Sequence, residues 1–573
     1  MSFRGNFLRK IYNAPETHYF YVLKIRRMRY CLYWLMIAFL GSCASVKKYN
    51  ERLEEPLTVK AMHRDIKYVQ KKLFTMHPDL DWYTDKDRLY ASFDSFRNTI
   101  TRPMSPREFY MRFAPLVAQV RQGHSGLYPM QQRYTKEEQQ RYKGSKSPLA
   151  QFRLKAEDNR YYLVEDLTVD THLVRGAEVL RINSITPQLL KDTFRNVITG
   201  DGDKNDAYFD HVTSSNILAL YSRLFGRVDT VVLSLKTPDS TFTQTVVRSY
   251  KNEIDSVVKY RDSLAVALIE SDSMLTDSVR TARIAALKEK PLVKKEYYGY
   301  NAETGRYAKE LEIVDSQLAI FTVRNFTEGL FYSKGYQEVF DSLKKLGIPN
   351  LVVDLRGNPG GRLAELHRLH GYLAAGDSFA TINPRAKTLS KIKMPFWTLK
   401  NMPVWLYPIA VPIVTVDGII YCSRTRSNGD GTYSYRMRQS RVRPASDLKY
   451  EGNVYLVTDG GTFSAAAILA ANFHSEQRGL IVGQETGGAY NGTVAGKLPM
   501  LKLRRTRMIF RVGTINISPY SPQGLPGRGV IPDVEVRSGK DDVLRDYDRE
   551  IAYIKDLVYG VGRKVKAARF SGN

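Results

Sequence analysis

The strongest candidate for a nucleophile is a serine that opens a helix of small residues. An apolar run from Val454 to Thr458 leads through a glycine turn to Ser464, and Ala465 starts a stretch that is almost wholly small. Helix N-termini present unpaired N–H groups and positive potential, which would stabilise an anionic tetrahedral intermediate beside this serine. Serine is also a frequent helix cap, and this segment alone favours the cap.

A glycine-rich loop after a second apolar strand is the next candidate feature. The stretch from Leu351 to Gly361 contains three glycines together with Asp354 and Arg356. Such a loop points backbone N–H groups into an anion-binding site, and the two charged residues would brace it. A tight strand-to-helix turn is the alternative. No Gly-Lys-Ser/Thr follows the loop, which argues against a phosphate site.

Four motifs in order resemble the C-terminal-processing, or tail-specific, serine peptidase family, which includes the tricorn protease core. They are Asp-x-Arg-x-Asn-x-Gly-Gly at 354–361, Thr-x-Ser-Ala at 462–465, Val-Gly-x-x-Thr at 482–486 and Gly-x-Gly-Val-x-Pro-Asp at 527–533. The resemblance spans roughly residues 57–545. It implies that Ser464 is the nucleophile. It also implies that backbone N–H groups of Ala465 and of Gly360 or Gly361 form the oxyanion hole.

A serine hydroxyl needs a base before it becomes a good nucleophile. Many family members use a lysine shortly after the Val-Gly-x-x-Thr segment. In this chain Ala489 occupies that position, and no lysine lies between Ser464 and Lys497. Tricorn-like members use a histidine at the end of the helical front region, where this chain has His124. The resemblance therefore implies His124 as the base, a task that suits imidazole near neutral pH. Lys497 stays the alternative.

A third group is needed to orient the histidine. Ser125 loosely matches an orienting serine of tricorn-like members, although it follows the histidine. Glu485 is a candidate carboxylate. The segment 200–206 has the alternating oxygen ligands of a calcium loop but lacks its glycine and its final acid, so we interpret it as a polar loop. We expect neither a metal nor a cofactor.

Three folded parts must bring these residues together. Helical spacing of apolar residues predicts a helical N-terminal domain that ends in the His124 loop. Short strands then predict a β domain, in which residues 176–183 and 187–194 resemble a strand and a helix of PDZ modules. Strands alternate with helices in the last part, and the resemblance implies a crotonase- or Clp-protease-like α/β catalytic core. The fold class is α+β and multidomain. The predicted divisions are a lipoprotein signal segment over 1–43, the helical domain over 57–148, the PDZ-like domain over 150–248, a charged helical insertion over 250–300, the peptidase core over 305–545 and a C-terminal helix and tail over 546–573.

The N-terminal segment predicts export and lipid anchoring. Basic residues precede an apolar run, Cys31 to Leu40, which is too short to span a bilayer comfortably. The run ends in Leu-Gly-Ser-Cys43, which resembles the lipobox of bacterial lipoproteins, with Met28 as the start of a short signal. The resemblance implies that Cys43 is lipidated and that the protein is anchored in the bacterial cell envelope, facing the periplasm. An uncleaved anchor is the alternative. We expect no other apolar stretch and therefore no polytopic membrane protein.

The charge of the chain points to an anionic partner. The sequence has 86 basic and 59 acidic residues, a net charge of +27. Nucleic acid and an anionic membrane are both possible partners, and we favour the membrane because no nucleic-acid motif is present. The arginines from Arg504 to Arg511 alternate as on a solvated strand pair. Two of the three cysteines lie in the leader, which excludes a disulfide scaffold and leaves Cys422 as a free thiol.

Two functions are compatible with the sequence. The first is a serine endopeptidase that hydrolyses unfolded or chain-end protein substrates through a Ser-His acyl-enzyme, with the PDZ-like module engaging the substrate. The alternative is a non-catalytic protein that binds a peptide or an apolar ligand on the same fold, which the missing lysine would allow. The presence of both Ser464 and His124 argues for the peptidase.

Overall fold

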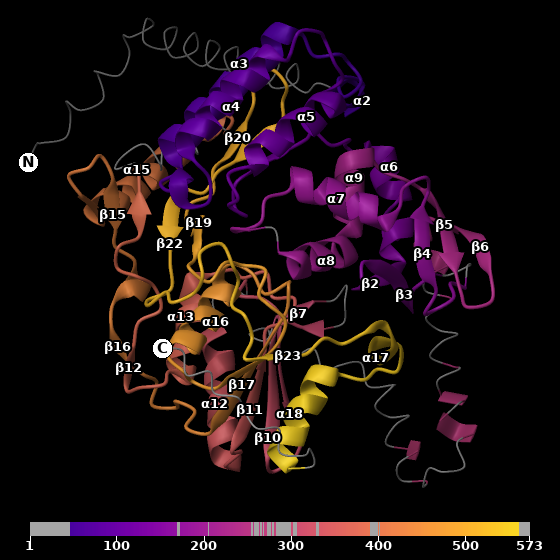
Figure 1. The fold of residues 1–573 in the computed structure, drawn as a ribbon, viewed down its shortest axis with the longest axis vertical. Coiled ribbons are helices and arrows are strands. Elements are labelled where there is room, and N and C mark those ends of the chain that lie inside the picture. Colours follow the sequence, from indigo (N-terminus) through magenta and orange to yellow (C-terminus); the bar gives the residue numbers. More distant parts are fainter. Residues whose placement is uncertain are drawn as a thin grey trace, which may run out of the picture.

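The computed structural model describes residues 46–168, 172–203, 205–253, 306–327, 332–389 and 402–560, together with isolated positions between 256 and 301 and Leu399. The signal segment over 1–43, most of the charged insertion over 250–300 and the tail from 561 lie outside the described residues. The described chain is a mixture of helices and sheets, which confirms the α+β class (Figure 1).

Three helices dominate the front of the chain, as their capping residues predict. Thr58, Asp85 and Ser105 each accept a hydrogen bond from the backbone two or three residues later, and Pro106 occupies the first turn of the third helix, where its missing N–H costs nothing. The elements of this region are α2 (Val46–Glu51), α3 (Val59–Met76), η1 (Leu80–Trp82), α4 (Lys86–Asn98), α5 (Pro106–Ala118), β1 (Gly126–Tyr128) and α6 (Lys136–Arg141).

A five-stranded antiparallel sheet in the order β2-β3-β4-β5-β6 follows, with three helices between β4 and β5. Its apolar residues join those of the front helices in one continuous core. The two parts are therefore packed together rather than separated by a linker. Its elements are η2 (Pro148–Ala150), β2 (Phe152–Glu157), β3 (Arg160–Asp166), β4 (Glu178–Ile182), α7 (Pro187–Val197), α8 (Asp206–Ser215), α9 (Ile217–Phe225), β5 (Thr230–Lys236) and β6 (Thr241–Val247).

The C-terminal part is built on a six-stranded sheet in the order β23-β18-β17-β11-β10-β9. All neighbours are parallel except β9 and β10. Helices α12, α13 and α16 share a core with the sheet, and α18 packs with a second apolar cluster that includes Val352 and Val457 (Figure 1). The elements are β9 (Lys309–Ile313), β10 (Leu318–Val323), α12 (Tyr332–Leu346), β11 (Asn350–Asp354), α13 (Leu363–Leu373), β17 (Asn453–Thr458), α16 (Ala465–Ser475), β18 (Leu480–Gly483), β23 (Val534–Glu535), α17 (Lys540–Leu544) and α18 (Arg549–Tyr559).

Parallel strands place their carboxyl ends on one edge of the sheet, where ligand sites form in such folds. The glycine loop after β11 and the turn after β17 meet there, because β11 and β17 are neighbours. Small sheets then connect this edge to the front of the chain: β1 pairs with β21, and β19 pairs with β22. These strands are β19 (Thr493–Ala495), β20 (Met500–Lys502), β21 (Ile509–Arg511) and β22 (Ile515–Ile517).

The expectation of a single apolar stretch near the N-terminus is wrong. Within the described residues, the stretch Val404–Ser423 is helical, long enough and apolar enough to cross a membrane by length and composition. Two prolines interrupt its sequence pattern, yet Pro408 falls in the first turn of the helix, where proline is tolerated. The neighbouring elements are β12 (Ser378–Phe379), β13 (Lys387–Thr388), η5 (Val404–Leu406), α15 (Tyr407–Ser423), β14 (Thr425–Ser427), β15 (Tyr433–Tyr435), η6 (Arg438–Ser440) and β16 (Arg443–Pro444); β7 (Tyr300–Asn301) and β8 (Arg306–Tyr307) form a short pair before the core sheet.

Candidate active site

Ser464 lies on a strained turn between β17 and α16. Its backbone has φ 53° and ψ −119°, a conformation that residues with a side chain rarely adopt. Asp459 stabilises the turn by accepting hydrogen bonds from the N–H groups of Gly461 (2.9 Å) and Gly357 (2.8 Å). The Ser464 side chain makes no capping hydrogen bond to α16. The helix-cap interpretation therefore fails, and the hydroxyl is available for another partner.

That partner is His124, which is 340 positions away in the sequence. The Oγ of Ser464 lies 3.1 Å from Nε2 of His124. Arg511 holds the histidine loop by donating to the carbonyl of His124 (3.0 Å) and to that of Gly123 (3.0 Å). The imidazole stacks on the ring of Phe463, and a side chain at position 123 would collide with that same ring. The glycine before the histidine is thus required by packing.

The other nitrogen of the imidazole begins a chain of hydrogen bonds. Nδ1 of His124 lies 3.1 Å from Oγ1 of Thr493, whose hydroxyl donates to Oδ1 of Asp201 (3.1 Å). The same carboxylate oxygen accepts the N–H of Gly123 (2.7 Å). Since the Thr493 hydrogen is used on Asp201, its oxygen is left to accept Nδ1–H of the imidazole. Nε2 is then the unprotonated nitrogen, the form that can take a proton from Ser464.

The charges of this chain are set by burial. Burial raises the pKa of Asp201 to about 7, even though its hydrogen bonds from Gly123 and Thr493 work in the other direction. Burial and the positive charge of Arg511 lower the pKa of His124, a residue that is partly buried. At pH 8 the arrangement is therefore a neutral imidazole connected through a hydroxyl to a carboxylate, which stabilises the imidazolium formed during proton transfer.

The two orienting residues expected from the sequence are wrong. Ser125 is buried just before β1, where its Oγ accepts the N–H of Gly513 (3.1 Å). Glu485 forms an ion pair with Arg528 (2.6 Å) and accepts the N–H of Gly529 (2.7 Å). Both side chains are occupied away from the imidazole.

The segment 200–206, interpreted as a polar loop, supplies the missing carboxylate instead. Asp201 is 4% exposed, whereas Asp203 is largely exposed and forms an ion pair with Arg121 (3.1 Å). The glycines on either side of Asp201 were a usable signal, because they let this part of the chain pass close to other backbone. Among the residues that the structure describes, no group of acids, histidines or cysteines could hold a metal ion.

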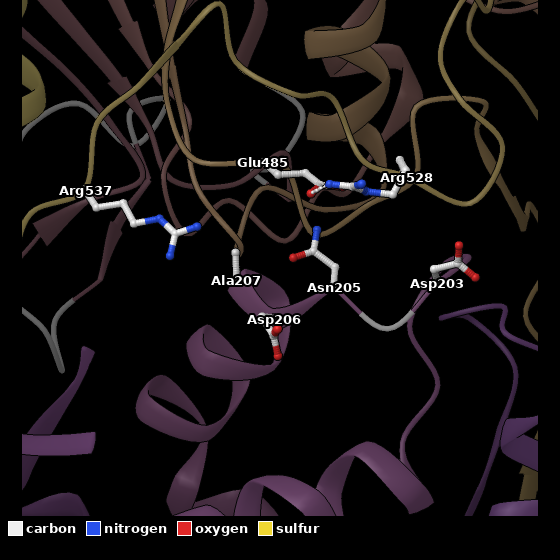
Figure 2. Close-up of a pocket in the computed structure, with 7 residues that line it drawn as sticks. All are labelled: Asp203, Asn205, Asp206, Ala207, Glu485, Arg528 and Arg537. Atoms are coloured by element: carbon white, nitrogen blue, oxygen red, sulfur yellow. Dashed lines mark hydrogen bonds and ion pairs between the residues drawn. The ribbon is translucent and has the colours of Figure 1, made fainter. Parts of the chain in front are cut away.

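Figure 2 shows where Glu485 lies. It lines a cavity of about 420 Å³ with Arg528, Arg537 and residues of the segment around Asn205, and its carboxylate points to Arg528. The Asn205 amide also donates to the carbonyl of Thr486 (3.0 Å). None of the residues that line this cavity belongs to the Ser464–His124–Thr493–Asp201 chain. Glu485 therefore connects loops of the core to each other.

This arrangement predicts a mild effect for Glu485→Gln. The substitution keeps the size of the side chain and removes the ion pair with the half-exposed Arg528, an interaction worth about 1 kcal/mol or less. We expect kcat/KM to stay within about threefold of wild type, since the imidazole keeps its hydrogen bonds. Steady-state hydrolysis of a peptide substrate measures this. A loss of a hundredfold or more would restore Glu485 as an orienting residue.

The glycine loop lies directly against Ser464. The N–H of Gly360 donates to Oδ1 of Asn358 (2.9 Å), so it is already used. Phe326 and Gly361 form a parallel bridge, in which Phe326 donates to the carbonyl of Gly360 and accepts the N–H of Arg362. The N–H of Gly361, between these two residues, therefore points away from Phe326. In the described part of the chain, the N–H groups of Gly361 and Ala465 make no backbone hydrogen bond. Of the two expected glycines, Gly361 is the available donor.

Gly360→Ala should therefore damage the site without touching a catalytic side chain. A methyl group at this position would lie 2.7 Å from the N–H nitrogen of Ala465 and 2.8 Å from Cβ of Ser464, at a φ of 91° that disfavours alanine. We expect kcat to fall by about 100-fold or more, because displaced N–H groups no longer meet the oxyanion. Gly376→Ala is a matched control, since its site is open and its φ is not positive. Equal kcat values for the two variants would contradict this arrangement.

The charged residues of the glycine loop act as braces, as expected. Arg356 donates to Asp354 (2.7 Å) and to Asp548 (2.6 Å), and it reaches Glu550 at 3.3 Å. The alternative base, Lys497, instead forms an ion pair with Asp417 on α15. Its ammonium group is thus engaged outside the chain of residues around Ser464.

The geometry is that of a serine hydrolase, and comparisons with known proteins define its class. Residues 317–536 match the model of peptidase family S41. The structure of mature CPAF complexed with lactacystin has a TM-score of 0.56 at 14% identity, over 88% of this chain and 98% of that one. This likeness shows the fold. The photosystem II D1 C-terminal processing protease (13% identity, 83% and 93% of the chains) and the tricorn protease (12%, 88% and 37%) have TM-scores of only 0.39 and 0.34. No curated protein sequence matches the chain.

The protein is a serine-type peptidase. Its residues 317–536 are similar to peptidase family S41, the C-terminal-processing peptidases.

Proposed function

We propose that this peptidase is an endopeptidase that hydrolyses unfolded or chain-end protein substrates by a Ser-His acyl-enzyme mechanism. The observation that carries the proposal is the 3.1 Å contact between Oγ of Ser464 and Nε2 of His124, on a serine whose side chain caps nothing. A binding protein would have no use for a strained serine in contact with a partly buried histidine.

In the acylation step, His124 takes the proton of Ser464 while Oγ attacks the substrate carbonyl carbon. The oxyanion accepts hydrogen bonds from the N–H groups of Ala465 and Gly361, at the positive end of α16. The Asp201 carboxylate stabilises the new imidazolium through Thr493. The imidazolium then donates its proton to the leaving amine as the C–N bond breaks. Water, deprotonated by His124, hydrolyses the acyl-enzyme.

The substrate would approach from the side of the β domain. A cavity of about 220 Å³ adjoins the histidine loop and is lined by apolar residues of α7 to α9 together with Arg223 and Arg511. An apolar floor with two cations fits a substrate side chain or an acidic chain end. We assign chain-end binding to the PDZ-like part of the sheet domain.

Digestion of unfolded casein tests this function. The protein from Ala44 onward contains every residue of the described fold. It should cleave casein at internal peptide bonds, and mass spectrometry should identify fragments from the interior of the casein chain. Loss of single terminal residues alone would contradict the endopeptidase assignment. Casein binding without cleavage would favour the ligand-binding alternative.

We also propose that Cys43 is lipidated and anchors the protein in the bacterial cell envelope, facing the periplasm. The support is the lipobox-like sequence before Cys43 and the short apolar run that precedes it. Cells fed with a labelled fatty acid should label the wild-type protein and not a Cys43→Ser variant. Equal labelling of the two would contradict lipidation at this residue.

A further inference from the structure

Helix α15 presents an apolar surface to solvent instead of to the protein. Its contact with the rest of the molecule is a narrow stripe, Ala410, Val414, Gly418 and Tyr421, at intervals of three or four residues. Tyr421 stacks on Tyr435 of β15 and donates to Thr388 of β13 (3.2 Å), which fixes the C-terminal end of the helix. Figure 1 shows α15 at the edge of the molecule, beside β15.

The remaining faces of the helix are apolar and exposed. Ile409, Ile413 and Ile419 have 67%, 64% and 65% of their surface exposed. A surface helix of a globular protein normally shows the reverse pattern, with charges outside and apolar residues inside. The further exposed apolar residues of this surface are Val404, Trp405, Val411, Val416 and Ile420. An apolar patch of this kind marks an interaction site.

The charges around the helix identify the partner. Between positions 385 and 443 the sequence has eleven lysines and arginines and two aspartates. One of these aspartates, Asp417, is the only acid on the helix, and Lys497 neutralises it. Two arginines close to the end of the helix, Arg426 on β14 and Arg436 just after β15, are exposed and, among the described residues, form no ion pair. An exposed apolar strip bordered by unpaired cations, with Trp405 and Tyr407 at one end, has the chemistry of a site for an anionic lipid surface.

A second copy of the chain is a poorer occupant of this surface. A two-fold interface places the same patch of both subunits face to face. The arginines beside α15 would then oppose their own equivalents without acids to pair with, and like charges across an interface weaken it. Acidic lipid headgroups have the opposite charge and also accept the apolar side chains below them.

The length and packing of the helix decide how it would meet a bilayer. The helical stretch Val404–Ser423 has 20 residues, roughly 30 Å at 1.5 Å per residue, so its length alone would match a hydrocarbon core of about 30 Å. One stripe of the helix, however, stays packed on the protein. A helix held in this way lies in the plane of the interface rather than across it.

We propose that α15 and the arginines beside it form a monotopic membrane-docking surface that inserts into the interface of an anionic bilayer. This contact is independent of lipidation at Cys43. It would hold the peptidase flat on the membrane, with α15 as the inserted element. The proposal does not depend on the peptidase mechanism either, because no residue of the surface belongs to the active site.

Flotation with vesicles tests the proposal on the chain from Ala44, which carries no lipid. Vesicles of phosphatidylcholine containing about a third phosphatidylglycerol should bind the wild type, and pure phosphatidylcholine vesicles should bind it less. The double substitution Ile409→Asn and Ile413→Asn should lower the partition coefficient by about tenfold or more without changing charge. Leu346→Asn, at a residue 57% exposed on α12, is the matched control and should bind as the wild type does.

Casein hydrolysis at wild-type rate by the double variant would show that it is folded. Equal vesicle binding by the double variant and the wild type would overturn the proposal. A second result would also overturn it: light scattering that shows a wild-type dimer and a monomeric double variant, together with flotation that shows no vesicle binding by either protein. The surface would then be an interface between copies of the chain. Tighter binding to neutral than to anionic vesicles would remove the role of the arginines.

Discussion

Ser464→Ala and His124→Asn should each lower kcat/KM for an unfolded protein substrate by about a thousandfold or more. The first removes the atom that attacks the carbonyl, and the second removes the base that lies 3.1 Å from it. Because the two side chains act in one step, the double variant should be little worse than either single variant. Activity that remains comes from the oxyanion hole and from substrate binding.

Folding must be separated from chemistry in this experiment. The side chains of Ser464 and His124 share one hydrogen bond, His124 makes one more to Thr493, and neither residue is part of an apolar core cluster. Thermal unfolding midpoints of the variants should therefore stay close to wild type. Independent and multiplicative losses from the two substitutions would show that His124 does not act through Ser464. Lys497→Met, which leaves the geometry of the base unchanged, is the control for the alternative lysine.

Asp201→Asn should produce the second large effect, a loss of about 100-fold in kcat at pH 8. Asparagine keeps the size of the side chain and removes the charge that stabilises the imidazolium through Thr493. Thr493→Val should have a similar cost, because it cuts the chain between His124 and the carboxylate (3.1 Å on each side). Thr493→Ser keeps the hydroxyl and should restore most of the activity. If Thr493 had only a structural role, kcat of Thr493→Ser would be no higher than kcat of Thr493→Val.

The dependence of kcat on pH provides a second test of the role of Asp201. Asp201 has its pKa raised to about 7, so below that pH it is protonated and gives no charge to the relay. Wild-type kcat should rise with pH through about 7, and the rise should disappear in Asp201→Asn. The lowered pKa of His124 keeps the imidazole neutral over this range, so it does not cause the rise. A wild-type profile that is flat between pH 6 and 8 would contradict the role of Asp201.

The stability of the wild-type protein should fall as pH rises through the range in which its kcat increases. The folded protein binds the Asp201 proton more tightly than the unfolded chain does, so between the ordinary pKa and about 7 the free energy of unfolding falls as pH rises. Asp201→Asn removes this ionisation. We therefore expect the variant to unfold at higher temperature than the wild type at pH 8, and the difference to shrink at pH 5. A less stable variant at pH 8 would show that the carboxylate is favourable for folding.

Local sequence drew attention to Ser464 and to the glycine loop, but the segment alone favoured a helix cap, and only the family resemblance implied that Ser464 is the nucleophile. Both are strand-turn-helix segments whose glycines, apolar strands and small residues act on near neighbours, and the brace by Arg356 involves Asp354 two positions away. The family resemblance also led to the fold class. The Ser464–His124 contact joins parts of the chain 340 residues apart, so no spacing rule in the sequence encodes it, and only the resemblance pointed to His124.

The orienting residues show where sequence reasoning fails. Ser125 and Glu485 have suitable chemistry and lie near motif residues, but their side chains bind Gly513 and Arg528, contacts that the local sequence does not show. Asp201 and Thr493 come from a loop of the β domain and a strand of the core. Hydrogen bonds from Gly123 to Asp201 and from Val494 to Gln122 bring both segments to the histidine loop. Helix α15 was missed because its two prolines break the pattern, and its exposure depends on tertiary packing that sequence does not show.

Covalent labelling with a fluorophosphonate probe tests the central claim most directly, since it needs no knowledge of the natural substrate. We expect one probe molecule to attach to the protein, and peptide mapping to place it on Ser464. His124→Asn should slow labelling by about a thousandfold, whereas Glu485→Gln should label at nearly the wild-type rate. Labelling of another serine, or equal rates for wild type and His124→Asn, would contradict the proposal that His124 activates Ser464.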